Sequence, residues 1–330
     1  MKKIKVAING FGRIGRAFYK VAKENENIEI VAVNDLTSKE NIEYLLKYDT
    51  VYGKCDLDLN GVKYLSEKDP NKLPWEALEI DIVVESTGLF TSSDKAQAHI
   101  IAGAKRVVVT APLKDDPMSV IKGETVLISM NEEKLSNCQI SSNASCTTNA
   151  SSPLLAILDS SIGIEKALLN TVHAYTASQS IVDGPNKKDM REGRAGAQNL
   201  IPSSTGAAIA ITKIMTELKE LFDGISIRVP VVSGSIVDIT FISKKNTTKE
   251  EVNEILKKAS KEDRWKGIFT VTEEDLVSSD IVGNRHASIA DLAFTRVVGG
   301  NLVKVLAWYD NEMGYTNTLV RHVIATGRLI

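Results

Sequence analysis

The first third of the chain alternates short, unbroken apolar runs with segments of helical periodicity. The runs cover residues 4–9, 28–34, 80–86 and 106–110 and are rich in Val and Ile. Such runs are typical of strands that are buried on both faces of a parallel sheet. Between the first two runs, apolar residues recur at helical spacing over residues 14–22, which predicts a helix packed on the sheet. We therefore expect a doubly wound α/β domain at the start of the chain.

After about residue 149 the predicted strands become longer and more alternating. Segments 225–232, 237–243 and 302–309 carry apolar residues at roughly every second position. This alternation favours a mostly antiparallel sheet with one face open to solvent or covered by helices. A chain of 330 residues is also long for a single core. We therefore predict a first domain over residues 1–148 and an α+β second domain over residues 149–311.

Three further segments of the second half have readable patterns. Helices are predicted over residues 206–221 and over residues 249–261, the latter beginning after a cap at Thr248. Residues 178–200 are polar and lack a clear period, which indicates a long ordered loop, and such loops are usually functional. The last stretch, residues 316–329, again has apolar residues at helical spacing.

Composition narrows the classes of function. Hydrophobic residues make up 43% of the chain and charged residues 25%, as in soluble globular proteins, and no apolar run is long enough to span a membrane. A net charge of −2 provides no basic field to attract nucleic acid. Three cysteines without a Cys-x-x-Cys pair argue against a disulfide framework and favour the reducing cytoplasm. The four histidines are far apart in sequence, so we expect no metal site.

A glycine-rich motif, Gly10-Phe11-Gly12-Arg13-Ile14-Gly15, follows the first predicted strand and opens the predicted helix. In that context it is the fingerprint of a dinucleotide-binding Rossmann domain. Gly10 allows a tight turn, Gly12 lets the backbone approach a pyrophosphate, and Gly15 lets helix and strand pack closely. Asp35 stands where a carboxylate accepts hydrogen bonds from the ribose hydroxyls and repels a 2′-phosphate. The motif therefore predicts a cofactor, and Asp35 predicts NAD over NADP.

A candidate nucleophile, Cys146, lies before a helix-like segment over residues 150–158. The dipole and unpaired amides at a helix N-terminus stabilise a thiolate and lower its pKa, and the same amides can hold an oxyanion. His173, at the end of a predicted strand, is the candidate base, because an imidazole beside sulfur stabilises the thiolate and then serves as acid or base. We expect these two residues to carry covalent catalysis on a carbonyl group.

Several residues of the second half are suited to hold an anion. Hydroxyl groups, guanidinium groups and helix N-termini are common phosphate ligands. Thr176, Arg191, the Thr205-Gly206 pair and Arg228 supply such groups. Arg228 lies in an apolar strand, where an arginine needs an anionic partner if it is buried. The alternative, an arginine on the solvated face of an alternating strand, stays open at this point.

The chain resembles the glyceraldehyde-3-phosphate dehydrogenase family from end to end. The resemblance is carried by the glycine motif, by Ser86-Thr87-Gly88, by Ala144–Asn149 around the cysteine, by residues 201–208 and by Trp308-Tyr309-Asp310-Asn311-Glu312. It implies a homotetramer whose subunits combine a Rossmann domain, completed by a C-terminal helix over residues 312–330, with a catalytic domain. The loop over residues 178–200 matches one that lies near a neighbouring cofactor in the family.

The resemblance also assigns roles to individual residues. Cys146 would form a thiohemiacetal and then a thioester of D-glyceraldehyde 3-phosphate, which inorganic phosphate attacks to release 1,3-bisphosphoglycerate, while His173 assists hydride transfer to NAD. The two phosphate subsites would use Ser145, Thr147, Thr176, Arg191, Thr205, Gly206 and Arg228. Cofactor contacts would come from Arg13, Ile14, Asp35, Lys68, Thr110 and Asn311 in addition to the three glycines. No membrane and no obligate nucleic-acid partner is implied.

The sequence departs from the family pattern at three positions. Ala150 stands where many relatives have a second cysteine, Val231 stands where many have a threonine, and Lys68 replaces a common arginine. Two alternatives remain open. One is an erythrose-4-phosphate dehydrogenase, which hydrolyses its thioester, and the other is a non-catalytic NAD- or RNA-binding protein, against which the intact Cys146 and His173 argue.

Overall fold

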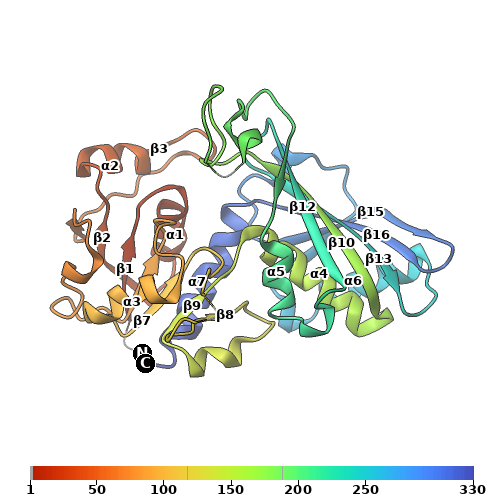
Figure 1. Ribbon diagram of the computed structural model, residues 1–330, viewed down its shortest axis with the longest axis horizontal. Coiled ribbons are helices and arrows are strands. Elements are labelled where there is room, and N and C mark those ends of the chain that lie inside the picture. Colours follow the sequence, from red (N-terminus) through yellow and green to blue (C-terminus); the bar gives the residue numbers. More distant parts are fainter. Residues whose placement is uncertain (1–2, 117, 188) are drawn as a thin grey trace. The chain divides into compact units, whose positions relative to one another are not determined.

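The computed structural model describes residues 3–116, 118–187 and 189–330, so residues 1, 2, 117 and 188 of the predicted domains and loop lie outside the described residues. The chain divides into two compact units. Unit 1 consists of the residues up to Ser145 together with Thr316–Ile330, and unit 2 is Cys146–Tyr315. Figure 1 labels the helices and strands of each unit.

Unit 1 is built around a parallel sheet. Within the described residues the sheet has seven strands in the order β5-β2-β1-β6-β7-β9-β8, and all neighbouring strands run parallel. This arrangement confirms the predicted doubly wound α/β fold. The strands are β1 (Ile4–Asn9), β2 (Ile28–Asn34), β5 (Lys63–Leu65), β6 (Ile82–Glu85), β7 (Arg106–Val109), β8 (Glu124–Thr125) and β9 (Ile140–Ser142).

Helices and short elements complete unit 1. Helix α1 (Arg13–Lys23) packs against β2 with the apolar stripe that the sequence predicts, and α3 (Ser93–Ile101) packs against β7. Helix α7 (Met313–Gly327) begins three residues before the segment predicted from apolar spacing and one residue after the start that the resemblance implied. From Thr316 onwards it belongs to unit 1, where His322 bonds Ser141 at 2.8 Å. The remaining elements are α2 (Lys39–Lys47), the hairpin of β3 (Tyr48–Asp49) and β4 (Gly53–Lys54), and the 3₁₀ helices η1 (Pro70–Lys72) and η2 (Glu132–Asn137).

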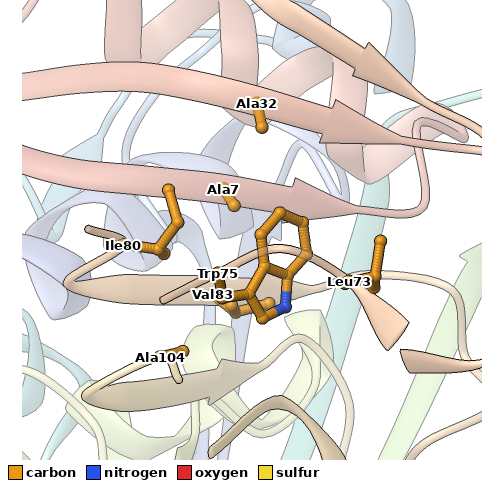
Figure 2. Close-up of a cluster of buried hydrophobic side chains, with 7 residues drawn as sticks. All are labelled: Ala7, Ala32, Leu73, Trp75, Ile80, Val83 and Ala104. Carbon is orange, nitrogen blue, oxygen red and sulfur yellow. The ribbon is translucent and has the colours of Figure 1, made fainter. Parts of the chain in front are cut away.

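An apolar cluster anchors one face of this sheet. Figure 2 shows Trp75, which is fully buried, among Ala7 of β1, Ala32 of β2 and Val83 of β6. An aromatic side chain of this kind buries roughly 150–250 Å², which at ~25 cal/mol per Å² stabilises the fold by about 4–6 kcal/mol. The alanines leave room beside the strands for the indole ring. Leu73, Ile80 and Ala104 complete the cluster.

Unit 2 is built around a mixed, mostly antiparallel sheet, as predicted. Its order within the described residues is β11-β12-β10-β13-β16-β15-β14. The pairs β10–β12 and β14–β15 are parallel, and the other neighbouring pairs are antiparallel. The strands are β10 (Ile164–Ala174), β11 (Ile201–Ser204), β12 (Phe222–Val229), β13 (Ser235–Ser243), β14 (Phe269–Thr272), β15 (Ser288–Val298) and β16 (Leu302–Tyr309).

Helices cover one face of the second sheet. Helix α4 (Cys146–Ile162) packs against β13, β15 and β16, and α6 (Lys249–Ala259) packs against α4 and β15. Accordingly, β13 alternates fully buried with partly exposed residues along its whole length. The cap predicted for α6 is confirmed, because the Thr248 side chain accepts a hydrogen bond from the Glu251 amide at 3.2 Å. Short 3₁₀ helices are η5 (Asp263–Trp265) and η6 (Ser278–Ile281).

The helix predicted over residues 206–221 is wrong in its length. Helix α5 covers only Ala207–Thr212, and a separate 3₁₀ helix, η4, covers Thr216–Leu218. The segment contains Ile209, Ile211, Thr212, Ile214 and Thr216, and β-branched side chains lose rotamer freedom in a helix. The apolar periodicity persists beyond the point where this helix ends.

The segment over residues 178–200 is a long loop, as predicted for its described residues. Its regular structure is limited to the 3₁₀ helix η3 (Met190–Gly193) and an isolated bridge between Ser180 and Ala195. Residue 188 of this loop lies outside the described residues.

Candidate active site

The glycine motif forms the turn between β1 and α1 in unit 1. Gly10 has φ +90°, and a Cβ at this position would lie 2.7 Å from the Thr87 amide nitrogen. A Cβ at Gly15 would lie 2.2 Å from the Gly10 carbonyl oxygen. At Gly12, by contrast, nothing lies within 4 Å of that position. The loop is therefore tight where helix and strand meet and open at the glycine that a pyrophosphate would approach, which fits a dinucleotide.

Asp35 lies beside this loop, just after β2. Its Oδ2 accepts a hydrogen bond from the Phe11 amide at 2.8 Å, and its Oδ1 accepts one from the Thr37 amide at 2.9 Å. Each carboxylate oxygen has a further lone pair. The side chain is partly exposed, so this second acceptor capacity is available to ribose hydroxyls.

The other residues predicted to contact the cofactor are distributed over both units. Arg13 and Ile14 open α1, and the Arg13 guanidinium lies 3.3 Å from Asp49 Oδ1. Thr110 follows β7, and its amide donates to the Glu85 carbonyl at 3.0 Å. Lys68 is exposed in the segment after β5. Asn311 belongs to unit 2, so its relation to the glycine loop stays a prediction.

Cys146 and His173 face each other within unit 2. Cys146 is the first residue of α4, and His173 is the penultimate residue of β10. The Cys146 Sγ lies 3.3 Å from His173 Nε2. Arg228 lies next to His173, because the register of the parallel strands β10 and β12 makes these two residues partners. A shift of one residue in this register would turn one of the two side chains to the opposite face.

The other nitrogen of His173 has two neighbours. His173 Nδ1 lies 2.7 Å from the Ala174 carbonyl oxygen and 2.7 Å from the Arg228 guanidinium nitrogen. A neutral imidazole carries one hydrogen. If Nδ1 donates to Ala174, then Nε2 has the lone pair that can accept a proton from Cys146. If Nδ1 accepts from Arg228, then Nε2 donates to the sulfur. The neighbours of Nδ1 therefore decide whether Nε2 acts as a base.

Burial dominates the protonation of this pair. It raises the pKa of the Cys146 thiol above its ordinary value, outweighing the charge of Arg228 and the hydrogen bonds with Thr147, which lower it. The lowered pKa expected from the helix N-terminus alone is therefore wrong, because desolvation is the larger effect. Burial, followed by the charge of Arg228, lowers the pKa of His173 to about 3. His173 is thus neutral near pH 7 and has a lone pair with which to accept a proton.

Two residues beside the pair were missed in the sequence. Tyr309 is buried, bonds Thr147 Oγ1 at 3.0 Å and Thr171 Oγ1 at 2.8 Å, and presents its ring edge-on to His173. Burial raises the pKa of Tyr309, so it is a neutral phenol. Ser235 accepts from the Ala174 amide and donates to Asn311 Oδ1, both at 3.0 Å. Tyr309 belongs to the motif that contains Asn311 and could have been noticed there, whereas Ser235 carries no such signal.

Among the predicted anion ligands, Arg228 directly contacts the catalytic pair. It is partly buried, its Nε is buried without a hydrogen-bond partner, and within the described residues it pairs with no carboxylate. A guanidinium in this state is suited to an anionic ligand. Arg191 is largely exposed and lies 3.4 Å from Asp189. Thr176 bonds Ser178 and Gln179, and Thr205 caps the Ala207 amide, so their phosphate roles stay predictions.

In residues 3–116, 118–187 and 189–330, no group of three or more His, Cys, Asp or Glu side chains could hold a metal ion. Over the same described part of the chain, no helix is long and apolar enough to cross a membrane.

Comparison with known proteins agrees with this geometry. A family model described as the NAD binding domain of glyceraldehyde 3-phosphate dehydrogenase matches residues 4–93, and a model of the C-terminal domain matches residues 145–311. A glyceraldehyde-3-phosphate dehydrogenase of Buchnera aphidicola is 45% identical over 328 residues, covering 96% of this chain and 97% of the relative. Another, of Borreliella burgdorferi, is 46% identical over 335 residues, covering 96% and 98% respectively. The similarity extends over nearly the whole length and agrees with the fingerprint loop beside Asp35 and with the contact of a cysteine and a histidine. The chain therefore belongs to the glyceraldehyde-3-phosphate dehydrogenase family, as an oxidoreductase that uses NAD.

Proposed function

We propose that the chain converts D-glyceraldehyde 3-phosphate and inorganic phosphate to 1,3-bisphosphoglycerate, with reduction of NAD, as a step of glycolysis and gluconeogenesis. The observation that carries this proposal is the 3.3 Å separation of Cys146 Sγ and His173 Nε2 in a member of this family. A thiol beside a neutral imidazole is the arrangement that covalent catalysis on an aldehyde requires.

His173 takes the proton of Cys146 as the sulfur bonds the aldehyde carbon, so that no free thiolate has to form first. His173 then returns the proton to the aldehyde oxygen, which gives a thiohemiacetal. Bound NAD supplies the hydride acceptor for the oxidation that follows. His173 takes the hydroxyl proton as the hydride leaves, so that a thioester remains on Cys146. A phosphate oxygen attacks the thioester carbon, and Cys146 departs as the leaving group and takes back the proton that His173 holds.

Arg228 is proposed as the principal anion ligand near this pair. Its unpartnered Nε and its contact with His173 support a role in holding the phosphate of a reactant close to the reacting carbon. We assign the remainder of the two phosphate subsites to Ser145, Thr147, Thr176, Arg191, Thr205 and Gly206.

We further propose that Asp35 selects NAD by accepting hydrogen bonds from the ribose hydroxyls. The other cofactor contacts are assigned to Arg13, Ile14, Lys68, Thr110 and Asn311. The open space over Gly12 and the free acceptor capacity of Asp35 support this assignment.

A homotetramer is proposed as the functional assembly. In support, the loop over residues 178–200 exposes large apolar side chains, including Ile181 at 90%, Val182 at 73% and Leu200 at 70%. Exposed apolar groups clustered in one loop are typical of a contact surface.

The test is the appearance of NADH absorbance with glyceraldehyde 3-phosphate, NAD and phosphate. The proposal expects turnover that depends on phosphate and is absent in Cys146→Ser. Erythrose 4-phosphate, assayed with and without phosphate, is the matched comparison. Faster, phosphate-independent turnover of erythrose 4-phosphate would replace the proposed activity with the hydrolytic one.

A further inference from the structure

A buried polar network in unit 1 joins the carboxyl ends of three neighbouring strands. Asn9, Asn34 and Glu85 are the last residues of β1, β2 and β6, and all three are buried. Asn34 Nδ2 donates to Asn9 Oδ1 at 2.8 Å, and Asn9 Nδ2 donates to Glu85 Oε2 at 2.6 Å. These strand ends form the edge at which a Rossmann sheet binds its dinucleotide. The mechanism proposed above makes no use of this network.

His99 of α3 connects the network to the apolar core. Trp75 Nε1 lies 3.0 Å from His99 Nδ1, and an indole N–H only donates. His99 Nδ1 must therefore carry a lone pair, which leaves the imidazole neutral with its hydrogen on Nε2. That hydrogen points to Glu85 Oε2, 3.0 Å from the His99 Nε2. The bond from Trp75 thus fixes which tautomer His99 presents to Glu85.

Glu85 also binds the segment around Thr87, which packs on the glycine loop. Its Oε1 accepts the Thr87 amide at 2.8 Å and also the Thr87 hydroxyl. The Thr87 backbone is what a Cβ at Gly10 would strike, and the neighbouring Ser86 hydroxyl donates to the Gly10 carbonyl at 2.6 Å. A displacement of Thr87 would therefore move the first glycine of the nucleotide loop.

The far end of this connection lies in the packed core of unit 1. The Trp75 ring is fully buried among side chains from β1, β2 and β6 (Figure 2), so its N–H group has a fixed direction. Glu85 itself is 1% exposed, and its carboxylate accepts hydrogen bonds from Asn9, Thr87 and His99. A functional loop keeps its geometry when residues behind it are locked by packing and hydrogen bonds.

We propose that Trp75, His99 and Glu85 are positioning residues for NAD, which hold Thr87 and the glycine loop at the spacing that the dinucleotide requires. None of the three needs to touch the cofactor. The inference rests on NAD binding and not on the aldehyde chemistry, so it is tested by NAD affinity in the absence of any aldehyde.

The experiment compares two buried carboxylates at opposite ends of β6. In Glu85→Gln, the new NH₂ group faces either the His99 and Asn9 donors or the Thr87 donors, so one set loses its acceptor. Asp81→Asn is the matched control, because Asp81 precedes β6 and accepts from the Lys5 amide at 2.9 Å and from Lys105 at 2.6 Å. Isothermal titration calorimetry measures the Kd for NAD of the purified full-length variants, and urea unfolding measures their stability.

Glu85→Gln is expected to raise the Kd for NAD roughly tenfold, corresponding to about 1.4 kcal/mol, whereas Asp81→Asn should leave it within about twofold. The KM for NAD should rise in parallel. The kcat at saturating NAD should stay unchanged, because Trp75, His99 and Glu85 take no part in the chemical step. Equal NAD affinity in the two variants would overturn the proposal. If Glu85→Gln does not fold, Trp75→Phe removes the N–H donor while keeping an aromatic ring in the core, and urea unfolding measures the stability lost with the smaller ring. An unchanged Kd for NAD in folded Trp75→Phe would likewise refute the proposed positioning role.

Discussion

Replacing Arg228 by alanine would remove a group that has two distinct effects on the site. The guanidinium lies 2.7 Å from His173 Nδ1, and its Nε is free to bind a phosphate. The first contact acts on every substrate, whereas the second acts only on substrates that carry a phosphate. Comparing glyceraldehyde 3-phosphate with glyceraldehyde therefore separates the two effects.

The magnitudes differ enough to be measured. A charge-assisted hydrogen bond to phosphate contributes about 1.5–3 kcal/mol, so its loss should lower kcat/KM for glyceraldehyde 3-phosphate roughly ten- to a hundredfold. On glyceraldehyde the loss should stay below about tenfold, because His173 keeps its bond to Ala174 and remains neutral at pH 7.5. His173→Asn, by contrast, should cost about 10²- to 10⁴-fold on both aldehydes, since it removes the base.

The assay is NADH formation at saturating NAD and phosphate, with each aldehyde varied in turn. Arg228→Lys is the control that keeps the positive charge and loses the two-pronged geometry of the guanidinium. It should fall between wild type and Arg228→Ala on the phosphorylated substrate. Equal losses for Arg228→Ala on the two aldehydes would show that Arg228 is structural, and its role as a phosphate ligand would have to be withdrawn.

Three further predictions concern separate residues. Iodoacetamide should modify Cys146 first and abolish turnover, as mass spectrometry and NADH formation would show; near wild-type activity of Cys146→Ser would disprove the covalent route. Asp35→Asn should narrow the preference for NAD over NADP in kcat/KM, and a wild type that prefers NADP would contradict the role given to Asp35. The free energy of unfolding should fall as pH decreases from 6.5 towards 3, because the unfolded chain binds protons that His322, with its pKa lowered to about 3 by burial, does not take up when folded. By pH 5 the protonation of His322 in the unfolded chain lowers the free energy of unfolding by about 2 kcal/mol. Urea unfolding should show a smaller loss of stability between pH 7.5 and pH 5 in His322→Gln than in wild type. An unchanged loss would exclude His322 as its cause.

The strands were largely predictable because their signal is local. The run over residues 4–9 and the alternating segment over residues 302–309 coincide with β1 and β16. A strand that is buried on both faces has a continuous run of apolar residues, and a strand that is buried on one face has an alternating pattern. The helix over residues 206–221 was not predictable in this way, since its apolar spacing is helical while its β-branched residues oppose a long helix.

The site was predictable only as far as single motifs reach. Cys146 and the glycines are recognisable from their immediate neighbours, but the contact of Arg228 with His173 depends on pairing between strands 55 residues apart. The raised pKa of Cys146 depends on burial by the whole unit, which outweighs the helix terminus visible in the sequence. Tyr309 was overlooked because its hydroxyl finds Thr171 only when the sheet is assembled.

The order of strands in unit 2 has a consequence for how activity is acquired. Arg228 reaches His173 through β12, and Tyr309 reaches it through β16, which joins the sheet only by pairing with β13 and β15. Pairings between residues so distant in the chain close large loops and form slowly, whereas helices such as α4 form from local contacts. During refolding, the helical circular dichroism signal should therefore return before the ability to form NADH, and a chain arrested in between would contain Cys146 at a helix terminus without the residues that make it an enzyme.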